Sequence, residues 1–291
     1  TDGVHKSIDG QLLVEGAKNT WFIFGGATNY ELSPEVFMTW EDDKKLRDFD
    51  PHDLVCAIMQ QAVKHSLADL EARHIADYGE LFHRVSFELN ETAVPDETTE
   101  ELLKVYGQGN RSRYLEVLYF QYGRYLLISS SRTIGVPANL QGIWNEYMLP
   151  PWSSNYTVNI NLEENYWAAE AAGLPEMHEV LLGFVRNLSQ NGSATAKNFY
   201  GIDRGWCLAH NSDIWAMTCP VGLGTGDPCW ANWSFGGAWL ATHIWEHWLF
   251  NRDMDALKRD YPALKGAAEF CIDYLVEKNN ELVPSPATSP E

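Results

Sequence analysis

The amino-acid sequence predicts a mainly α-helical chain that begins with a short β-rich segment, and three observations support this. From residue 53 onward, apolar residues recur at the spacing of a helix. Residues 11–30 instead hold short apolar runs separated by glycines, which is typical of strands. The later helical segments are joined by two long loops rich in glycine and tryptophan, residues 132–163 and 200–235, and loops of this length are usually functional.

Short elements are expected in the first third of the chain. Strands are predicted at residues 12–14 and 21–24, where apolar runs end near glycines. Residues 53–89 should be helical linker material that ends in a short extended piece, residues 84–89. The polar residues 90–97 should then form a surface connection.

Helical spacing dominates the rest of the chain. We expect helices over residues 112–131, 165–172, 178–190 and 236–250, and two more within residues 254–278. Pro262 should separate those two, because proline cannot donate the helical hydrogen bond. The proline-rich end, residues 284–291, should be irregular.

The charge balance excludes two classes of partner. The 291 residues include 21 Lys and Arg against 40 Asp and Glu, a net charge of −19 at pH 7. Such a chain repels nucleic acid and anionic membranes, and no apolar run approaches the roughly 18 residues of a membrane span. We therefore expect neither nucleic-acid binding nor membrane insertion. A neutral glycan is compatible with this charge, although simple solubility explains it equally well.

Tryptophan is concentrated in one region. Ten of the twelve tryptophans lie between Trp144 and Trp248, and many are flanked by Gly, Asn, Asp or Ser. Sugar rings present apolar C–H faces to aromatic rings, while their hydroxyls require polar partners. The region therefore favours a sugar-binding pocket, and the alternative is a tryptophan-rich helical core.

Residues 157–162 suggest a polar ledge within that region. If the segment is extended, Thr157, Asn159 and Asn161 share one face, and the apolar residues between them share the other. The apolar face could anchor the ledge to a core while two amides and a hydroxyl hold sugar hydroxyls or a water. The alternative is a half-buried strand with solvated amides.

Several ordered motifs over about residues 55–291 resemble glycoside hydrolase family 95, which contains α-L-fucosidases and α-L-galactosidases. The similar segments are residues 137–144, 151–152, 159–162, 165–167, 210–215, 236–240, 284–285 and 289–291. The resemblance implies the tail of an N-terminal β-rich domain over residues 1–52 and a helical linker over 53–97. It implies the N-terminal part of an (α/α)6 catalytic barrel over residues 98–291.

The resemblance also implies a mechanism. The chain would belong to an inverting exo-glycosidase that releases terminal α-L-galactose or α-L-fucose from an oligosaccharide or polysaccharide. Inversion requires an acid that protonates the leaving oxygen and a base that activates a water. The acid would be Glu291, while Asn159 and Asn161 would position the water. The base would be a carboxylate beyond residue 291.

One position departs from the fucosidase pattern. Many fucosidases of the family carry histidine where this chain has Thr157. L-Fucose lacks the C6 hydroxyl of L-galactose, and a shorter side chain with a hydroxyl leaves room for that group and can bind it. Because a site that binds a hydroxyl discriminates against the deoxy sugar, Thr157 favours L-galactose.

Other pocket residues are weaker candidates. His210 and Asp213, in a His-Asn-x-Asp motif, are expected in the substrate pocket or behind it, and the alternative is an interhelical hydrogen-bond cluster. The remaining candidates are Gln141, Trp144, Trp230 and Trp233.

A rival motif points to a different chemistry. His243, Glu246 and His247 fit the H-x-x-E-H pattern of some zinc peptidases, and both histidines would share a helix face. The flanking apolar residues favour a buried structural helix instead. No metal and no other cofactor is therefore expected, and the five cysteines, without a CxxC pair, are expected to be buried thiols.

A third possibility is a non-catalytic carbohydrate-binding module, which would bind sugar without hydrolysis. The substrate class suggests a periplasmic or secreted location, because enzymes that degrade polysaccharides usually work outside the cytoplasm.

Overall fold

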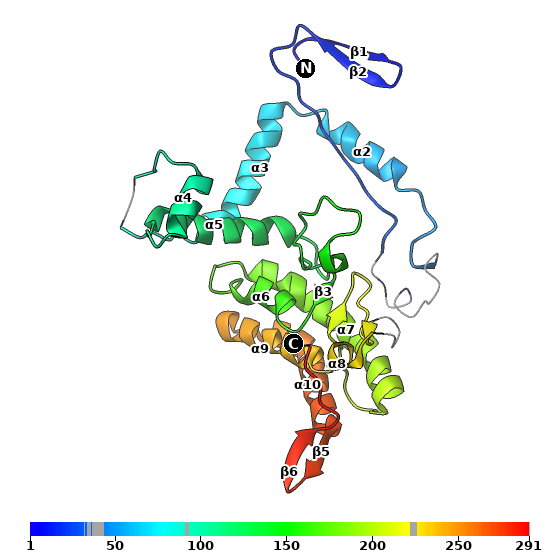
Figure 1. Ribbon diagram of the computed structural model, residues 1–291. Coiled ribbons are helices and arrows are strands. Elements are labelled where there is room, and N and C mark those ends of the chain that lie inside the picture. Colours follow the sequence, from blue (N-terminus) through cyan, green and yellow to red (C-terminus); the bar gives the residue numbers. More distant parts are fainter. Residues whose placement is uncertain (32, 34–35, 37–43, 91–92, 222–225, 291) are drawn as a thin grey trace. The chain divides into compact units, whose positions relative to one another are not determined.

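The computed structural model describes residues 1–31, 33, 36, 44–90, 93–221 and 226–290 (Figure 1). The chain divides into two compact units, residues 1–31 with 46–77, and residues 32–45 with 78–291. The expected division at residues 52 and 97 stays a prediction.

The first unit opens with a β-hairpin. Strands β1 (Val4–Ile8) and β2 (Gln11–Glu15) pair antiparallel, with Ile8 opposite Gln11. Asp9 and Gly10 form the turn at φ of 48° and 76°, the left-handed conformation that a tight hairpin requires. The strand expected at 12–14 is thus confirmed within β2.

The strand expected at residues 21–24 does not form. This segment has no regular secondary structure, and the side chains of Trp21, Phe22 and Phe24 are exposed. A strand needs a hydrogen-bonded neighbour, and none of the described residues pairs with this run.

Two helices follow, as the spacing predicted for the linker. Helix α2 spans His52–Ala62, and α3 spans Leu67–Phe82. Ser66 begins α3: its hydroxyl accepts from the Asp69 N–H, and the Asp69 carboxylate accepts from the Ser66 N–H. The extended piece expected at 84–89 forms no strand.

The second unit, which includes the end of α3, is mainly helical. Its elements are α4 (Thr99–Tyr106), α5 (Arg113–Ser130), the 3-10 helix η2 (Pro151–Ser154), β3 (Tyr156–Thr157), α6 (Asn161–Trp167), α7 (Pro175–Tyr200), β4 (Asn211–Ser212), α8 (Pro228–Ala231), α9 (Gly236–Asn251), α10 (Met254–Tyr274), β5 (Leu275–Lys278) and β6 (Glu281–Pro284). The helices predicted at 112–131 and 236–250 correspond to α5 and α9. The mainly helical fold class is confirmed.

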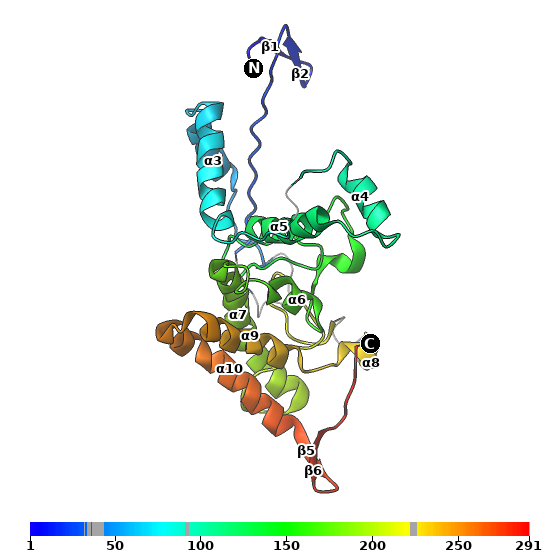
Figure 2. The same ribbon diagram turned by 90° about the vertical axis from the view of Figure 1, so that its left-hand side faces the viewer.

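The core of this unit lies among α7, α9 and α10, which pack side by side (Figure 2). Leu181, Phe184 and Leu188 of α7 are fully buried, as is Leu240 of α9. Trp206 joins them, and its indole N–H donates to the Ala263 carbonyl of α10 at 2.7 Å. Burial of these side chains supplies most of the driving force that holds the three helices together.

Three predicted elements differ from the structure. Helix α7 is longer than predicted, and α6 begins before the predicted start. Helix α10 continues through Pro262, so the expected break is wrong. Ala256, Ala263 and Ala267 of α10 are buried, and this tertiary packing outweighs the one helical hydrogen bond that proline loses.

Helix α10 is followed by a hairpin, where a second helix had been expected up to residue 278. Strands β5 and β6 pair antiparallel, and Asn279 and Asn280 form the turn at φ of 56° and 63°. Asparagine tolerates this left-handed conformation better than most residues. Of the end that was expected to be irregular, residues 285–290 are irregular, whereas Pro284 is the last residue of β6 and Glu291 lies outside the described residues. None of the described helices is both long and apolar enough to span a membrane.

Candidate functional site

A cavity of about 820 Å³ lies in the second unit. The two long loops and the start of α6 supply nearly all of its walls. These are formed by Leu140, Gln141, Trp152, Ser153, Asn155, Thr157, Asn159, Asn161, His210, Asn211, Ser212, Asp213, Met217, Val221, Trp230 and Pro290. Its size lies within the range of small-molecule sites, and amides, hydroxyls and indoles dominate its wall.

The ledge residues all line this cavity, although not as a strand. Strand β3 ends at Thr157, residues 158–160 form a turn, and α6 begins at Asn161. The extended backbone expected over residues 157–162 is therefore wrong, because β3 pairs with only two residues of β4 and ends at Thr157. Val158 is nevertheless fully buried, and its N–H donates to the His210 carbonyl at 3.0 Å. That burial anchors the ledge to the core.

The Thr157 hydroxyl belongs to a short chain of polar contacts. It donates to Asn155 Oδ1 at 2.6 Å and accepts from Asn211 Nδ2 at 3.4 Å. A hydroxyl has one proton and two lone pairs, so Thr157 Oγ1 retains one acceptor position. Asn155 was missed by the sequence reasoning, although it lies only two residues from Thr157.

Residues of the second loop line the cavity beside the ledge. The His210 ring lies edge-on to the Trp230 ring, with centroids 5.6 Å apart. Asp213 Oδ1 accepts from the N–H groups of Trp215 and Met217, at 2.9 and 3.1 Å. This carboxylate therefore shapes the loop, while its residue also lines the cavity.

Two residues predicted to line the pocket, Trp144 and Trp233, lie outside the cavity wall, and the predicted acid Glu291 is not among the described residues. Trp144 is not part of the cavity wall, and its ring lies 6.4 Å from that of Tyr125. Trp233 packs against the hydrophobic core. Glu291 lies outside the described residues, whereas the preceding Pro290 lines the cavity. The roles assigned to Glu291, Asn159 and Asn161 stay predictions.

The three side chains of the H-x-x-E-H motif, His243, Glu246 and His247, do not face a common position. Glu246 is exposed, whereas His243 and His247 are buried and face different partners. His243 Nδ1 contacts His178 Nε2 at 2.8 Å, and His247 Nδ1 contacts Glu170 Oε1 at 2.5 Å. The structure thus does not assemble the triplet proposed from the sequence.

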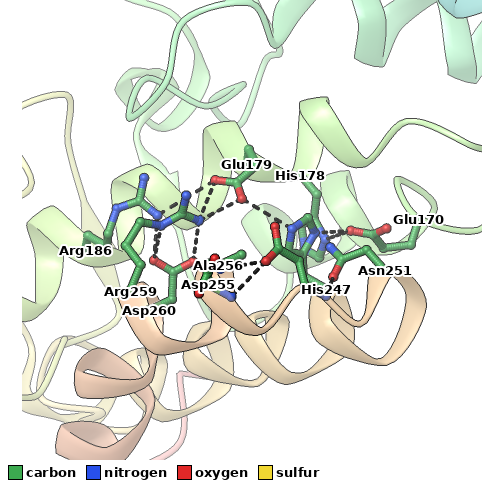
Figure 3. Close-up of polar contacts among 11 residues, drawn as sticks. Glu170, His178, Glu179, Arg186, His247, Asn251, Asp255, Ala256, Arg259 and Asp260 are labelled. Carbon is green, nitrogen blue, oxygen red and sulfur yellow. Dashed lines mark hydrogen bonds and ion pairs between the residues drawn. The ribbon is translucent and has the colours of Figure 1, made fainter.

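Glu170, His178 and His247 instead form a buried cluster with ligand atoms within 4.8 Å of one another, a set that could hold a metal ion (Figure 3). Glu170 Oε1 is 2.7 Å from His178 Nδ1 and 2.5 Å from His247 Nδ1. These are hydrogen-bond distances, whereas two ligands of a tetrahedral zinc ion lie roughly 3.3 Å apart, given bonds of about 2.0–2.1 Å. The geometry favours a hydrogen-bonded cluster.

Charges around this cluster are paired. His247 Nε2 lies 3.3 Å from Glu179 Oε1, and Arg259 binds both Glu179 and Asp260 (Figure 3). Burial by itself would lower the pKa of His247, but hydrogen bonds to Glu170 and Glu179 raise this pKa to about 9. His247 is therefore charged at neutral pH and offsets the two carboxylates.

Glu163 of α6 is different, because it has no such partner. Its side chain is fully buried, and neither carboxyl oxygen has a hydrogen-bond partner on another of the described residues. Burial raises the pKa of Glu163 to about 9. At neutral pH this carboxyl is thus protonated.

A mainly helical unit whose cavity is lined by amides, hydroxyls and indoles has the features of a small-molecule site. Comparisons with known proteins identify the family. The catalytic-domain profile of glycosyl hydrolase family 95 matches residues 66–291. The chain belongs to glycoside hydrolase family 95.

Curated relatives agree with this assignment. The chain is 44% identical over 235 residues to alpha-L-fucosidase 2 of Arabidopsis thaliana, a match that covers 78% of this chain and 27% of that protein. It is 34% identical over 284 residues to probable alpha-fucosidase A of Aspergillus niger, covering 95% of this chain and 35% of that protein. The chain therefore spans about a quarter to a third of the length of these relatives.

Proposed function

We propose that the full-length protein is an inverting exo-glycosidase that releases terminal α-L-galactose or α-L-fucose from glycans. The observation that carries the proposal is the cavity that Thr157, Asn159 and Asn161 line together with His210 and Trp230. The relatives named alpha-fucosidase support the substrate class. The barrel fold and a periplasmic or secreted location are parts of the same proposal.

The roles follow from the chemistry of inversion. Two neighbouring side-chain amides can hold a water through their oxygens and N–H groups. Asn159, in the turn before α6, and Asn161, the first residue of α6, have this role in our proposal. Glu291 protonates the leaving oxygen, and a carboxylate further along the full-length protein removes a proton from the water. No metal enters this scheme.

Thr157 favours L-galactose in this proposal. Its hydroxyl proton is already donated to Asn155, so the free lone pair can accept the proton of the sugar's C6 hydroxyl. L-Fucose lacks this hydroxyl and would leave the buried acceptor unpaired, which costs binding energy.

Proton NMR of the first product tests the mechanism. The full-length protein is incubated with 4-nitrophenyl α-L-fucoside and α-L-galactoside, and the anomeric signals are followed before mutarotation. The β-anomer should form first, and Asn161→Ala should lose most of the rate. Initial release of the α-anomer contradicts inversion. Sugar binding without any hydrolysis indicates a carbohydrate-binding module instead.

Glu291→Gln tests the proposed acid. On natural glycans, whose leaving groups need protonation, this variant should lose most of its activity. A smaller loss is expected on the 4-nitrophenyl glycosides, because nitrophenolate leaves without a proton. An unchanged rate on the natural glycan rules out Glu291 as the acid.

A further inference from the structure

The residues that line the cavity differ widely in their exposure to solvent. Thr157, Asn211 and Ser212 are almost fully buried, whereas the side chain of Trp152 is 76% exposed. A large apolar ring therefore lies at the solvent-facing end, and hydroxyls and amides lie at the buried end. A ligand that enters this cavity meets the indole of Trp152 at its outer part.

The backbone that carries this ring is strained. Trp152, Ser153 and Ser154 have φ values of 48°, 58° and 47°. Residues other than glycine rarely adopt this left-handed conformation, and a run of three is unusual. Strain of this kind persists only where the surrounding structure enforces it, and it is concentrated at functional sites.

Contacts on both sides enforce the turn. Pro150 and Pro151 precede it, and the Ser153 N–H donates to the Pro150 carbonyl at 2.9 Å. After the turn, the Asn155 carbonyl accepts from the Leu140 N–H at 3.0 Å, and Asn155 Oδ1 accepts the Thr157 hydroxyl proton. The position of Trp152 is thus tied through Asn155 to Thr157.

Internal packing does not explain why the ring is held there. None of the described residues makes a ring contact or a hydrogen bond with the Trp152 indole. A conformation that costs free energy here presents an apolar ring to solvent at the edge of a polar cavity. Such an arrangement is typical of a ligand contact.

We propose that Trp152 is the stacking platform for the penultimate sugar, the pyranose to which the terminal L-sugar is attached. This inference rests on the proposed function. The terminal sugar, which must reach Thr157, Asn159 and Asn161, occupies the buried polar end. The next ring then lies at the exposed end, where its apolar C–H face can cover the indole.

A comparison of two substrates tests this assignment in the full-length protein. One is a disaccharide that joins the preferred α-L-sugar to D-galactose, and the other is the fluoride of the same α-L-sugar, which has no second ring. Trp152→Ala should lower kcat/KM for the disaccharide about tenfold or more, as loss of a tryptophan anchor does. The fluoride should be hydrolysed at the wild-type rate.

Matched variants separate the ring from the fold. Trp152→Phe should keep most of the disaccharide activity, because it retains an aromatic face, whereas Trp152→Leu should lose it. Trp245→Ala, which removes a half-exposed tryptophan of α9 outside the cavity wall, is the control and should change neither substrate.

Three results overturn the inference. They are an equal loss on both substrates in Trp152→Ala, an unchanged disaccharide activity, and an equal loss in the Phe and Leu variants. These results differ from failure of the proposed function itself. In that case the wild type would hydrolyse neither substrate, and both proposals would be overturned.

Discussion

Glu163→Gln should make the protein more stable at alkaline pH. The pKa of Glu163 rises from its ordinary 4.5 to about 9 because the side chain is buried. Between these values the folded state keeps a proton that the unfolded state has lost. The free energy of unfolding therefore falls by about 1.4 kcal/mol for each pH unit in this window. The stability contribution is complete below pH 4.5 and is lost as the pH rises through 9.

The size of the effect follows directly. From pH 5 to pH 8 the wild type should lose about 4 kcal/mol of stability through this group alone. Glutamine has nearly the same shape and does not titrate, so the variant should lack that part of the pH dependence. Glu164→Gln is the matched control, because the neighbouring Glu164 is exposed and should leave the pH dependence as it is in the wild type.

Urea unfolding at pH 5 and pH 8, followed by tryptophan fluorescence, measures this difference. The expected result is that the loss of stability from pH 5 to pH 8 is smaller in Glu163→Gln than in the wild type and Glu164→Gln. If all three proteins lose equal stability over this range, Glu163 is ionised in the folded state or has a partner, and the reasoning is refuted.

Two further substitutions test other parts of the structure. Ser154→Gly should raise the free energy of unfolding by about 1 kcal/mol, because glycine tolerates the φ of 47° and the Ser154 hydroxyl is buried with no hydrogen-bond partner among the described residues. Ser154→Ala keeps the strained Cβ and should gain less, and thermal melts compare the two variants. His247→Gln should cost about 3 kcal/mol, because it removes the cation that lies between the buried Glu170 and Glu179, and only Glu179 keeps an arginine partner, Arg259. The wild-type contribution of this histidine is complete below pH 6.5 and lost as the pH rises through 9. Glu246→Gln, on the exposed side of the same helix, should change nothing, and equal urea midpoints for both variants contradict the pairing.

The helices were the most predictable part of the fold. Helices α5 and α9 follow from local apolar spacing, and that spacing reflects the core that they cover. The break predicted at Pro262 is wrong because proline's loss of one helical hydrogen bond was considered alone, whereas packing of α10 against its neighbours keeps the helix continuous. The β5–β6 hairpin could have been found, since Asn279 and Asn280 suit a tight turn between two apolar runs.

The site was predicted unevenly. Sequence pattern and resemblance both pointed to Thr157, Asn159 and Asn161, but the strand that was expected to give them a common face ends at Thr157. The cluster of Glu170, His178 and His247 brings a residue of α9 to two residues that lie 77 and 69 positions earlier in the chain, so no local pattern could reveal it. The left-handed turn at Trp152, Ser153 and Ser154 contains no glycine or asparagine, so the sequence gives no signal that predicts its conformation.

The central claim is that the Thr157 hydroxyl favours L-galactose, and one measurement tests it most directly. It is the ratio of kcat/KM for 4-nitrophenyl α-L-galactoside to kcat/KM for the α-L-fucoside, compared between the full-length protein and its Thr157→His variant. The wild-type ratio should exceed one, because the C6 hydroxyl gains a partner in Thr157. The histidine variant should lower the ratio by filling that space. A ratio that the substitution leaves unchanged contradicts the role of Thr157, and the absence of hydrolysis of either glycoside by the wild type contradicts the glycosidase assignment itself.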